Sequence, residues 1–157
     1  MPRPSQSWTS RGRLGQPAVM SSQDPYQGRF AQLVGYRVTA WRDDHAEVSL
    51  EIREEHLNRS GVLHGGVMTT LIDSACGYCG CYSPDPARPR RAMTVSLTCH
   101  FIGPVREGDR LTAEARRTGG GRQIFFCDCK VVDQQGRLVA EGSGVFKYRR
   151  GSEPEAL

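Results

Sequence analysis

The sequence predicts an α+β fold, in which a curved antiparallel sheet of about six strands wraps around one long central helix. The first observation is an apolar stretch, residues 65–82, with hydrophobic side chains at helical spacing and very few polar ones. Such a helix must be covered by other structure. The second is that stretches before and after it alternate between apolar and polar residues, as half-buried strands do. The third is the shortness of the turns between these stretches, which favours antiparallel neighbours.

One domain, residues 23–148, is expected to contain these elements. The chain has 157 residues, which is enough for one hydrophobic core. Residues 1–22 show no periodicity and contain several prolines, serines and glycines but no acidic residue. This composition predicts a disordered tail. The last residues, 149–157, are expected to fray.

The segment before the long helix is expected to form a short helix and a β-hairpin. Residues 24–33 begin with an Asp-Pro pair, which suits the cap and first turn of a helix. Residues 34–41 and 46–52 alternate, and the pair Asp43–Asp44 between them supplies a turn. A loop, residues 54–63, then leads into the long helix.

The segment after the long helix is rich in predicted strands. A proline-rich stretch, residues 83–90, ends the helix and should form an exposed loop. We expect the strands that follow to form a meander, each one beside its predecessor. They are predicted at residues 93–102, 111–118, 123–132 and 138–148. One helix cannot cover both faces of such a sheet, so the other face or an edge should pair with a second subunit.

Charge and hydropathy exclude several classes of partner. The net charge of +4 is carried mostly by arginines. This mild excess suits an anionic small molecule better than a nucleic acid, which usually requires a dense basic stripe. No apolar run approaches the roughly 18 residues of a membrane span, and no secretory signal is visible. A cytoplasmic protein is therefore expected. The arginines of the tail leave the mitochondrial matrix as an alternative, although the prolines there argue against an amphipathic leader.

Six cysteines are present, and they fit buried thiols better than a metal site. Cys76 and Cys79 would lie one helical turn apart, and Cys127 and Cys129 would share one face of a strand. Two cysteines in a C-x-C arrangement on a strand have poor spacing for zinc ligands. We therefore expect reduced, buried thiols and no metal.

The most informative segment joins the loop to the start of the long helix. His64, Gly65 and Gly66 lie at the helix mouth, and Asp73 lies two turns inside. A helix N-terminus presents unpaired N–H groups and the positive end of the helix dipole, and glycines let a ligand approach the backbone. An acid inside an apolar helix is costly unless it is paired or used. The pattern indicates an oxyanion-binding corner and a catalytic carboxylate.

These residues resemble a known family. The pattern Asn58, His64-Gly65-Gly66 and Asp73, followed by strands with Gly103-Pro104 and Gly108-Asp109, is similar to the hotdog-fold acyl-CoA thioesterases. The branch it most resembles is the phenylacetate-pathway (PaaI-type) group. The resemblance covers nearly the whole domain. It implies the hotdog fold, hydrolysis of an acyl- or aryl-CoA thioester to free acid and CoA, and no cofactor.

The resemblance also implies roles for site residues. Asp73 would be the general base or the direct nucleophile, and Gly65 would aim its N–H at the thioester oxygen. Asn58 would position water or the thioester, and His64 would hold the thioester or the loop. Thr94 would assist the water.

Each of these residues also has a structural alternative. Asp73 could fix the helix through a local hydrogen bond, and the two glycines could simply allow a tight entry into the helix. Asn58 could satisfy a turn, and His64 could be a structural histidine. Ser96 is an alternative to Thr94.

Substrate-binding residues are less specific in the sequence. Gly66 lies at the helix end, and Arg90, Arg91 and Arg122 are candidate partners of CoA phosphates, with Arg149 as a further one. Arginine suits phosphate because its donors form a planar fork. The acyl preference cannot be read from the sequence. Four residues could line the acyl pocket or belong to the core: Met68, Tyr78, Tyr82 and Phe101.

The spacing along the helix predicts a composite site. Gly65 and Asp73 are eight residues apart, which is about 12 Å along a helix. One thioester carbon cannot contact both within a single chain. A homodimer with antiparallel helices would supply Gly65 from one chain and Asp73 from the other. The resemblance implies the same division, with Asn58, His64 and Gly65 from one chain and Asp73 and Thr94 from its partner. We expect such a dimer, further assembled into a homotetramer.

Two other functions are possible on this fold. A non-catalytic acyl-CoA sensor would need a DNA-binding element to act as a regulator, and the tail before residue 23 is too short for one. A hydratase or dehydratase is disfavoured by the spacing of Asn58 and Asp73. Fold alone does not decide between these functions.

Overall fold

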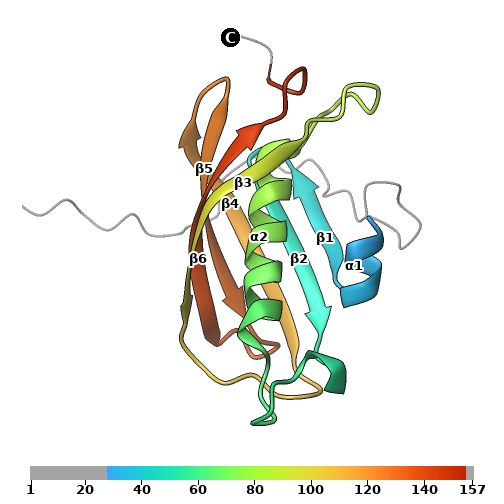
Figure 1. The fold of residues 1–157 in the computed structure, drawn as a ribbon, viewed down its shortest axis with the longest axis vertical. Coiled ribbons are helices and arrows are strands. Elements are labelled where there is room, and N and C mark those ends of the chain that lie inside the picture. Colours follow the sequence, from blue (N-terminus) through green and yellow to red (C-terminus); the bar gives the residue numbers. More distant parts are fainter. Residues whose placement is uncertain (1–27, 155–157) are drawn as a thin grey trace, which may run out of the picture.

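The computed structural model describes residues 28–154 and confirms the predicted α+β hotdog architecture. A six-stranded antiparallel sheet, in the order β1-β2-β4-β5-β6-β3, curves around the long helix α2 (Figure 1). The strands are β1 (Arg37–Arg42), β2 (His45–Glu51), β3 (Ala92–Phe101), β4 (Arg110–Gly120), β5 (Ile124–Val132) and β6 (Leu138–Tyr148). The helices are α1 (Arg29–Val34), the short 3-10 helix η1 (Glu54–His56) and α2 (Gly65–Cys81).

The core lies between α2 and the concave face of the sheet. Alternate residues of β2, β4 and β5 point toward α2 and are almost fully buried, as the period of a strand requires. The buried residues of α2 are Met68, Leu71, Ile72, Ala75, Cys76, Cys79 and Gly80. The remaining stripe of α2 is only partly buried and carries Asp73.

The predicted four-strand meander after the helix is wrong in one respect. β4, β5 and β6 are consecutive neighbours, but β3 pairs with β6 at the far edge of the sheet, so it does not lie beside β4. The connection 102–109 is long enough for this: crossing three strand spacings takes about 14 Å, and eight extended residues span roughly 26 Å. β3 therefore forms an edge, and Met93, Val95 and Phe101 on it are 52%, 59% and 59% exposed.

Several boundaries differ from the sequence prediction. The predicted helix 24–33 is helical from Arg29 in its described part, and it ends at Val34; residues 24–27, like the predicted tail 1–22, lie outside the described residues. The predicted loop 54–63 contains η1. The glycine turn begins later than expected, because Gly120 is still in β4 at a φ of 123°, and a Cβ there would lie 2.5 Å from the carbonyl oxygen of Ile124.

Residues after β6 continue along the neighbouring loop. The Arg149 N–H donates to the carbonyl oxygen of Arg91 at 2.8 Å, and the Ser152 N–H donates to the carbonyl oxygen of Arg149. The described part of the predicted frayed end is therefore tied to the loop between α2 and β3. None of the helices within residues 28–154 has the length and apolar character needed to cross a membrane.

Candidate active site

The N-terminus of α2 leaves one backbone amide for a ligand. His64 caps the helix, and its Nδ1 accepts a hydrogen bond from the Gly66 N–H at 2.9 Å. The next two amides, of Val67 and Met68, donate to the carbonyl oxygen of His64. Among the described residues, the N–H of Gly65 has no acceptor. A Cβ on Gly65 would contact only the ring of Phe101, at 3.5 Å.

Asn58 shapes the loop that precedes this helix mouth. Its Oδ1 accepts hydrogen bonds from the Ser60 N–H at 2.8 Å and from the Val62 N–H at 3.4 Å. The side-chain oxygen is therefore engaged in the turn, as an asparagine in a loop often is. Both of these contacts use the oxygen, so the amide nitrogen is the atom that could serve a ligand.

A buried histidine that the sequence did not single out supports this loop. His56 is 4% exposed, and its Nδ1 accepts from the Arg53 N–H at 3.1 Å while its Nε2 donates to the carbonyl oxygen of Val34 at 2.9 Å. The carbonyl oxygen of His56 accepts from the His64 N–H. Thus His56 ties the end of α1 and the helix cap to one another.

Asp73 and Thr94 meet across the gap between helix and edge strand. Thr94 Oγ1 donates to Asp73 Oδ1 at 2.7 Å. Thr94 pairs with Phe146 of β6, so it faces α2, whereas Ser96 pairs with Val145 on the opposite face. The structure therefore brings Thr94, and not Ser96, to the carboxylate.

A cavity of about 730 Å³ adjoins Asp73 and Thr94. Its aromatic wall consists of Tyr36, Trp41, Tyr78 and Phe146, and its basic rim consists of Arg90, Arg91 and Arg149. Asn58, His64 and Gly65 do not line it. Within one chain the candidate residues thus fall into two groups: the helix mouth, defined by Asn58, His64 and Gly65, and the carboxylate pocket, defined by Asp73 and Thr94.

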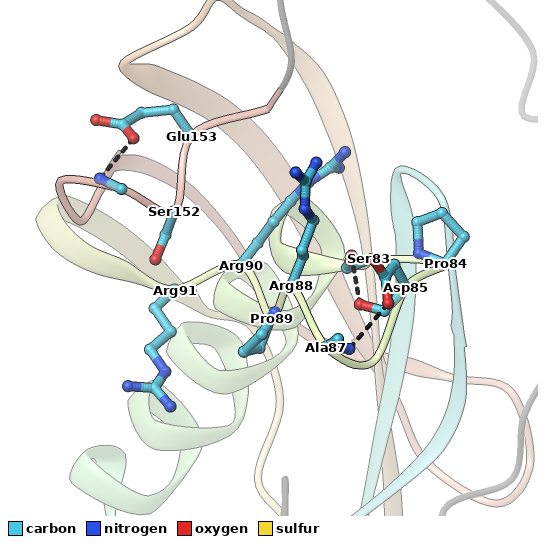
Figure 2. A pocket seen from close by; sticks show the side chains of 11 residues that line it. Ser83, Pro84, Asp85, Ala87, Arg88, Pro89, Arg90, Arg91, Ser152 and Glu153 are labelled. Atoms are coloured by element: carbon cyan, nitrogen blue, oxygen red, sulfur yellow. Dashed lines mark hydrogen bonds between the residues drawn. The ribbon is translucent and has the colours of Figure 1, made fainter.

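A second hollow, of about 980 Å³, lies between the α2–β3 loop and the segment after β6 (Figure 2). Arg88 and Arg90 extend from the loop toward the same side in Figure 2, whereas Arg91 points away from them. Pro89, Arg90 and Arg91 line both hollows, so the carboxylate pocket and the second hollow adjoin at these residues. Arg122, on the turn between β4 and β5, lines neither of them.

The comparisons with known proteins show which family the chain belongs to. A family model described as the thioesterase superfamily matches residues 60–140, which include His64, Gly65, Asp73 and Thr94. The chain belongs to the thioesterase superfamily. Its relatives include the Pseudomonas aeruginosa protein PA0474, 38% identical over 99 residues that cover 63% of this chain and 72% of that protein.

Two further matches concern a PaaI protein. The acyl-coenzyme A thioesterase PaaI of Escherichia coli is 31% identical over 110 residues, covering 70% of this chain and 75% of that protein. The solved structure of the E. coli PaaI protein from the phenylacetic acid degradation operon superposes with a TM-score of 0.72 at 26% identity, covering 81% of this chain and 88% of that one. The predicted resemblance to PaaI-type hotdog thioesterases is confirmed.

Several lining residues of this thioesterase were missed in the sequence. Gly77 and Cys81 follow Asp73 at intervals of four residues, so the helical period alone could have placed them on its stripe. Trp41 comes from the distant hairpin, and no local signal points to it. Its Nε1 donates to the carbonyl oxygen of Tyr78 at 2.8 Å, and its ring meets the rings of Tyr78 and Tyr82 edge to face. Met68 belongs to the core.

The cysteines of this thioesterase lie mostly behind the site. All six are free thiols, and Cys76, Cys79, Cys127 and Cys129 are buried between α2 and β5. Hydrogen bonding to Cys127 and burial raise the pKa of Cys76 and Cys79 well above the ordinary thiol value. These two thiols therefore stay protonated and act as small apolar side chains.

Proposed function

We propose that this thioesterase hydrolyses an acyl- or aryl-CoA thioester to the free acid and CoA, without a cofactor. The observation that carries the proposal is a carboxylate, Asp73, that is held by Thr94 and adjoins a cavity of about 730 Å³. The E. coli relative named acyl-coenzyme A thioesterase PaaI supports the choice of substrate class.

The leaving group of a thioester departs easily. A thiol has a pKa of about 8.5, so its thiolate departs without a strong general acid. Asp73 then acts in one of two ways: as a general base that takes a proton from water, or as a nucleophile that attacks the thioester carbonyl. The single hydroxyl hydrogen of Thr94 is donated to Asp73, so Thr94 is a positioning residue whose oxygen can still accept from a water molecule.

The oxyanion of the tetrahedral intermediate needs donors that are already in place. The Gly65 N–H is suited to this, because it lies at the positive end of the α2 dipole and has no acceptor among the described residues. Asn58 and His64 lie on the same side of the site and would hold the thioester near this amide.

A complete site then requires two chains. Gly65 and Asp73 are separated by about 12 Å along α2, and the carboxylate pocket has no contribution from the helix mouth. In a homodimer with antiparallel helices, the helix mouth of one protomer faces the carboxylate pocket of the other, twice. The exposed apolar edge of β3 supports such a dimer, which would further pair into a tetramer.

CoA carries phosphates that need cationic partners. Arg90 and Arg91 suit this role, because they lie where the carboxylate pocket adjoins the second hollow. Arg88 also lines the second hollow. The Gly66 N–H cannot bind the substrate directly, because it donates to His64 Nδ1. Arg122 is the weakest candidate, because it lines neither hollow.

The test is thiol release from a panel of aryl-, short-chain and long-chain acyl-CoAs, with Asp73→Asn as the variant. Loss of a general base or nucleophile should lower the rate by about 10²–10⁴-fold, while acyl-CoA still raises the melting temperature. Asp128→Asn on the opposite sheet face is the matched control and should keep full activity. If the wild type binds acyl-CoA but does not hydrolyse it, the proposed thioesterase activity is refuted and a non-catalytic sensor is indicated.

We also propose a cytoplasmic location. All six cysteines are free thiols, as is usual in a reducing compartment. A C-terminal fluorescent fusion of the full chain tests this, and a signal that follows an organelle marker or the cell envelope would contradict it.

A further inference from the structure

A buried histidine lies between two carboxylates on the face of the sheet that points away from α2. His45, the first residue of β2, is 3% exposed. Its Nε2 is 3.3 Å from Glu47 Oε1, and its Nδ1 is 3.7 Å from Glu114 Oε1. The second distance is too long for a hydrogen bond. Nδ1 is therefore a buried polar atom without a hydrogen-bond partner, which is unusual among the described residues.

The strand register places the two carboxylates against each other. Glu47 of β2 pairs directly with Glu114 of β4, and His45 pairs with Arg116. Like charges directly opposite on neighbouring strands are destabilising unless a cation lies between them. Arg116 supplies part of that charge, with Nη2 at 2.7 Å and Nε at 3.1 Å from Glu114 Oε1.

We propose that His45, Glu47 and Glu114 bind a divalent transition-metal ion of the zinc type. One ligand atom from each of the three residues lies within 4.8 Å of the others, the only such set of histidine, cysteine and acidic side chains within residues 28–154. Ligand atoms at about 2.0–2.2 Å from a tetrahedral ion are roughly 3.3–3.6 Å apart, and the 3.3 Å between His45 Nε2 and Glu47 Oε1 falls in this range. The 3.7 Å to Glu114 Oε1 starts from the other ring nitrogen, so one of the two carboxylates must turn toward the nitrogen that binds the ion.

The donor set decides the class of ion. An imidazole nitrogen with two carboxylate oxygens suits zinc and its neighbours in the first transition row, whereas magnesium and calcium prefer oxygen alone. The two carboxylates balance the charge of the ion. Arg116 remains bonded to Glu114 and orients it. Each ring nitrogen of His45 has one of the two carboxylates near it, so the nitrogen that does not bind the ion still faces a carboxylate.

The position of the cluster makes it a structural clamp. The neighbours of Glu47 along β2, Ala46 and Val48, are fully buried toward α2, so Glu47 points to the other face. The ion would therefore join β2 to β4 behind the sheet and would not contact Asp73. The site is independent of the proposed thioester hydrolysis, and either can fail without the other.

The experiment is a Co²⁺ titration of chelator-treated full-length protein, followed by absorption and calorimetry. Co²⁺ replaces zinc as the probe because a thiolate ligand gives an intense charge-transfer band, and the six cysteines are competing ligands. We expect one ion per chain without that band. Glu47→Gln and Glu114→Gln should each weaken binding by about tenfold or more. Zn²⁺ should raise the melting temperature of the wild type and much less that of the variants.

The matched control is His100→Gln. His100 Nδ1 lies 3.6 Å from Glu141 Oε1 on the same sheet face, but this pair is exposed and has no third ligand. This variant should bind Co²⁺ as the wild type does. The proposal is refuted if the wild type does not bind, if the glutamine variants bind equally well, or if the thiolate band appears. Circular dichroism of the metal-free variants checks that they fold. We expect the fold to tolerate Glu47→Gln, because the Glu47 side chain is 36% exposed.

Discussion

Gly65 and Gly66 are adjacent, yet only one of them can serve a ligand. The Gly66 N–H is held by the cap His64, and a Cβ on Gly66 would lie 3.0 Å from His64 Nδ1. The Gly65 N–H has no acceptor within the described residues, and a Cβ there would make ordinary contact with Phe101. The two positions therefore have different roles: the first offers its N–H to a ligand, and the second leaves room for the helix cap.

Gly65→Pro should remove the oxyanion donor without unfolding the protein. Proline is favoured at the first position of a helix, and His64 already has the extended backbone (φ −65°, ψ 131°) that a residue before proline needs. We expect kcat to fall by about 10²–10³-fold, as for other oxyanion donors, with an unchanged or slightly raised melting temperature. Gly65→Ala keeps the N–H and is the control. Equal rates for the two variants would show that the amide is not a donor in the reaction.

Thr94→Val should slow turnover while leaving the fold intact. The variant removes the 2.7 Å hydrogen bond to Asp73, and a hydrogen bond to a charged group is worth about 1.5–3 kcal/mol, or roughly 10- to 100-fold in rate. Thr94→Ser should restore most of kcat because it restores the donor. Thr98→Val, on the same strand but facing away from α2, should have no effect. A serine variant as slow as the valine variant would count against a positioning role.

The sequence predicted the residues of the site but not all of their contacts. Strict alternation would put Thr94 and Ser96 on one face, so the pattern could not separate them. A register shift between these two residues, a β-bulge, turns them to opposite faces. Such a bulge depends on the partner strand β6, and nothing local in the sequence marks it. His64 and Asn58 show the reverse case: their local capping and turn contacts were foreseen as alternatives and are present.

At the level of elements, α2 lies very close to the sheet at Gly80. A Cβ at Gly80 would lie 2.2 Å from the ring of Phe125, which is fully buried between Phe146 and Tyr148. Tyr148 Oη also donates to the carbonyl oxygen of Gly80 at 2.8 Å, and burial raises the pKa of Tyr148 to about 12, so the phenol keeps its proton. The end of α2 is thus held against β5 and β6 by contacts that require a glycine.

Gly80→Ala should therefore destabilise the fold by about 1–3 kcal/mol, because the added methyl group overpacks the core. Gly77→Ala on the same helix is the control: its Cβ would be 3.7 Å from Phe146, an ordinary contact, and alanine favours a helix over glycine by up to about 1 kcal/mol. Chemical denaturation of both variants measures the difference. A Gly80→Ala protein as stable as Gly77→Ala would mean that the helix can shift away from β5.

The elements themselves could be predicted from periodicity, but their neighbours could not. The hairpins β1–β2, β4–β5 and β5–β6 follow from short turns, and all are present. β3 is different because the eight residues between it and β4 permit many placements, and pairing with β6 is decided by the whole sheet. Trp41 of the aromatic wall was missed for the same reason: it reaches the carboxylate pocket because the edge strand β1 lies beside α2 in the folded sheet (Figure 1).

For the molecule as a whole, the exposed edge of β3 is the feature that most requires a partner. Proteins normally protect edge strands with charges, prolines or bulges, and an exposed apolar edge invites pairing. Val95→Lys should weaken the dimer and lower thioesterase activity in parallel, with lost activity recovered at high protein concentration. Sedimentation velocity and kinetics at several concentrations test this. Leu33→Lys, on the 78% exposed side chain of α1, is the control and should change neither. Dimers that persist in Val95→Lys would place the interface elsewhere.

The composite site can be tested directly by mixing two inactive chains. Asp73→Asn keeps the helix mouth but loses the carboxylate, and Gly65→Pro keeps the carboxylate but loses the oxyanion amide. If each site combines Gly65 of one protomer with Asp73 of the other, a heterodimer of these variants contains one intact site and one doubly defective site.

Random assortment makes half of the dimers heterodimers, so co-expression should restore about a quarter of the wild-type activity, and a purified heterodimer with two different tags should show about half. Both homodimers remain inactive as internal controls. A site built within one chain predicts no recovery, because each chain then carries its own defect. Heterodimers as inactive as their parents would therefore refute the shared site, even if the enzyme proved to be dimeric. The helix mouth and the carboxylate pocket of one chain would then have to act on different parts of the substrate.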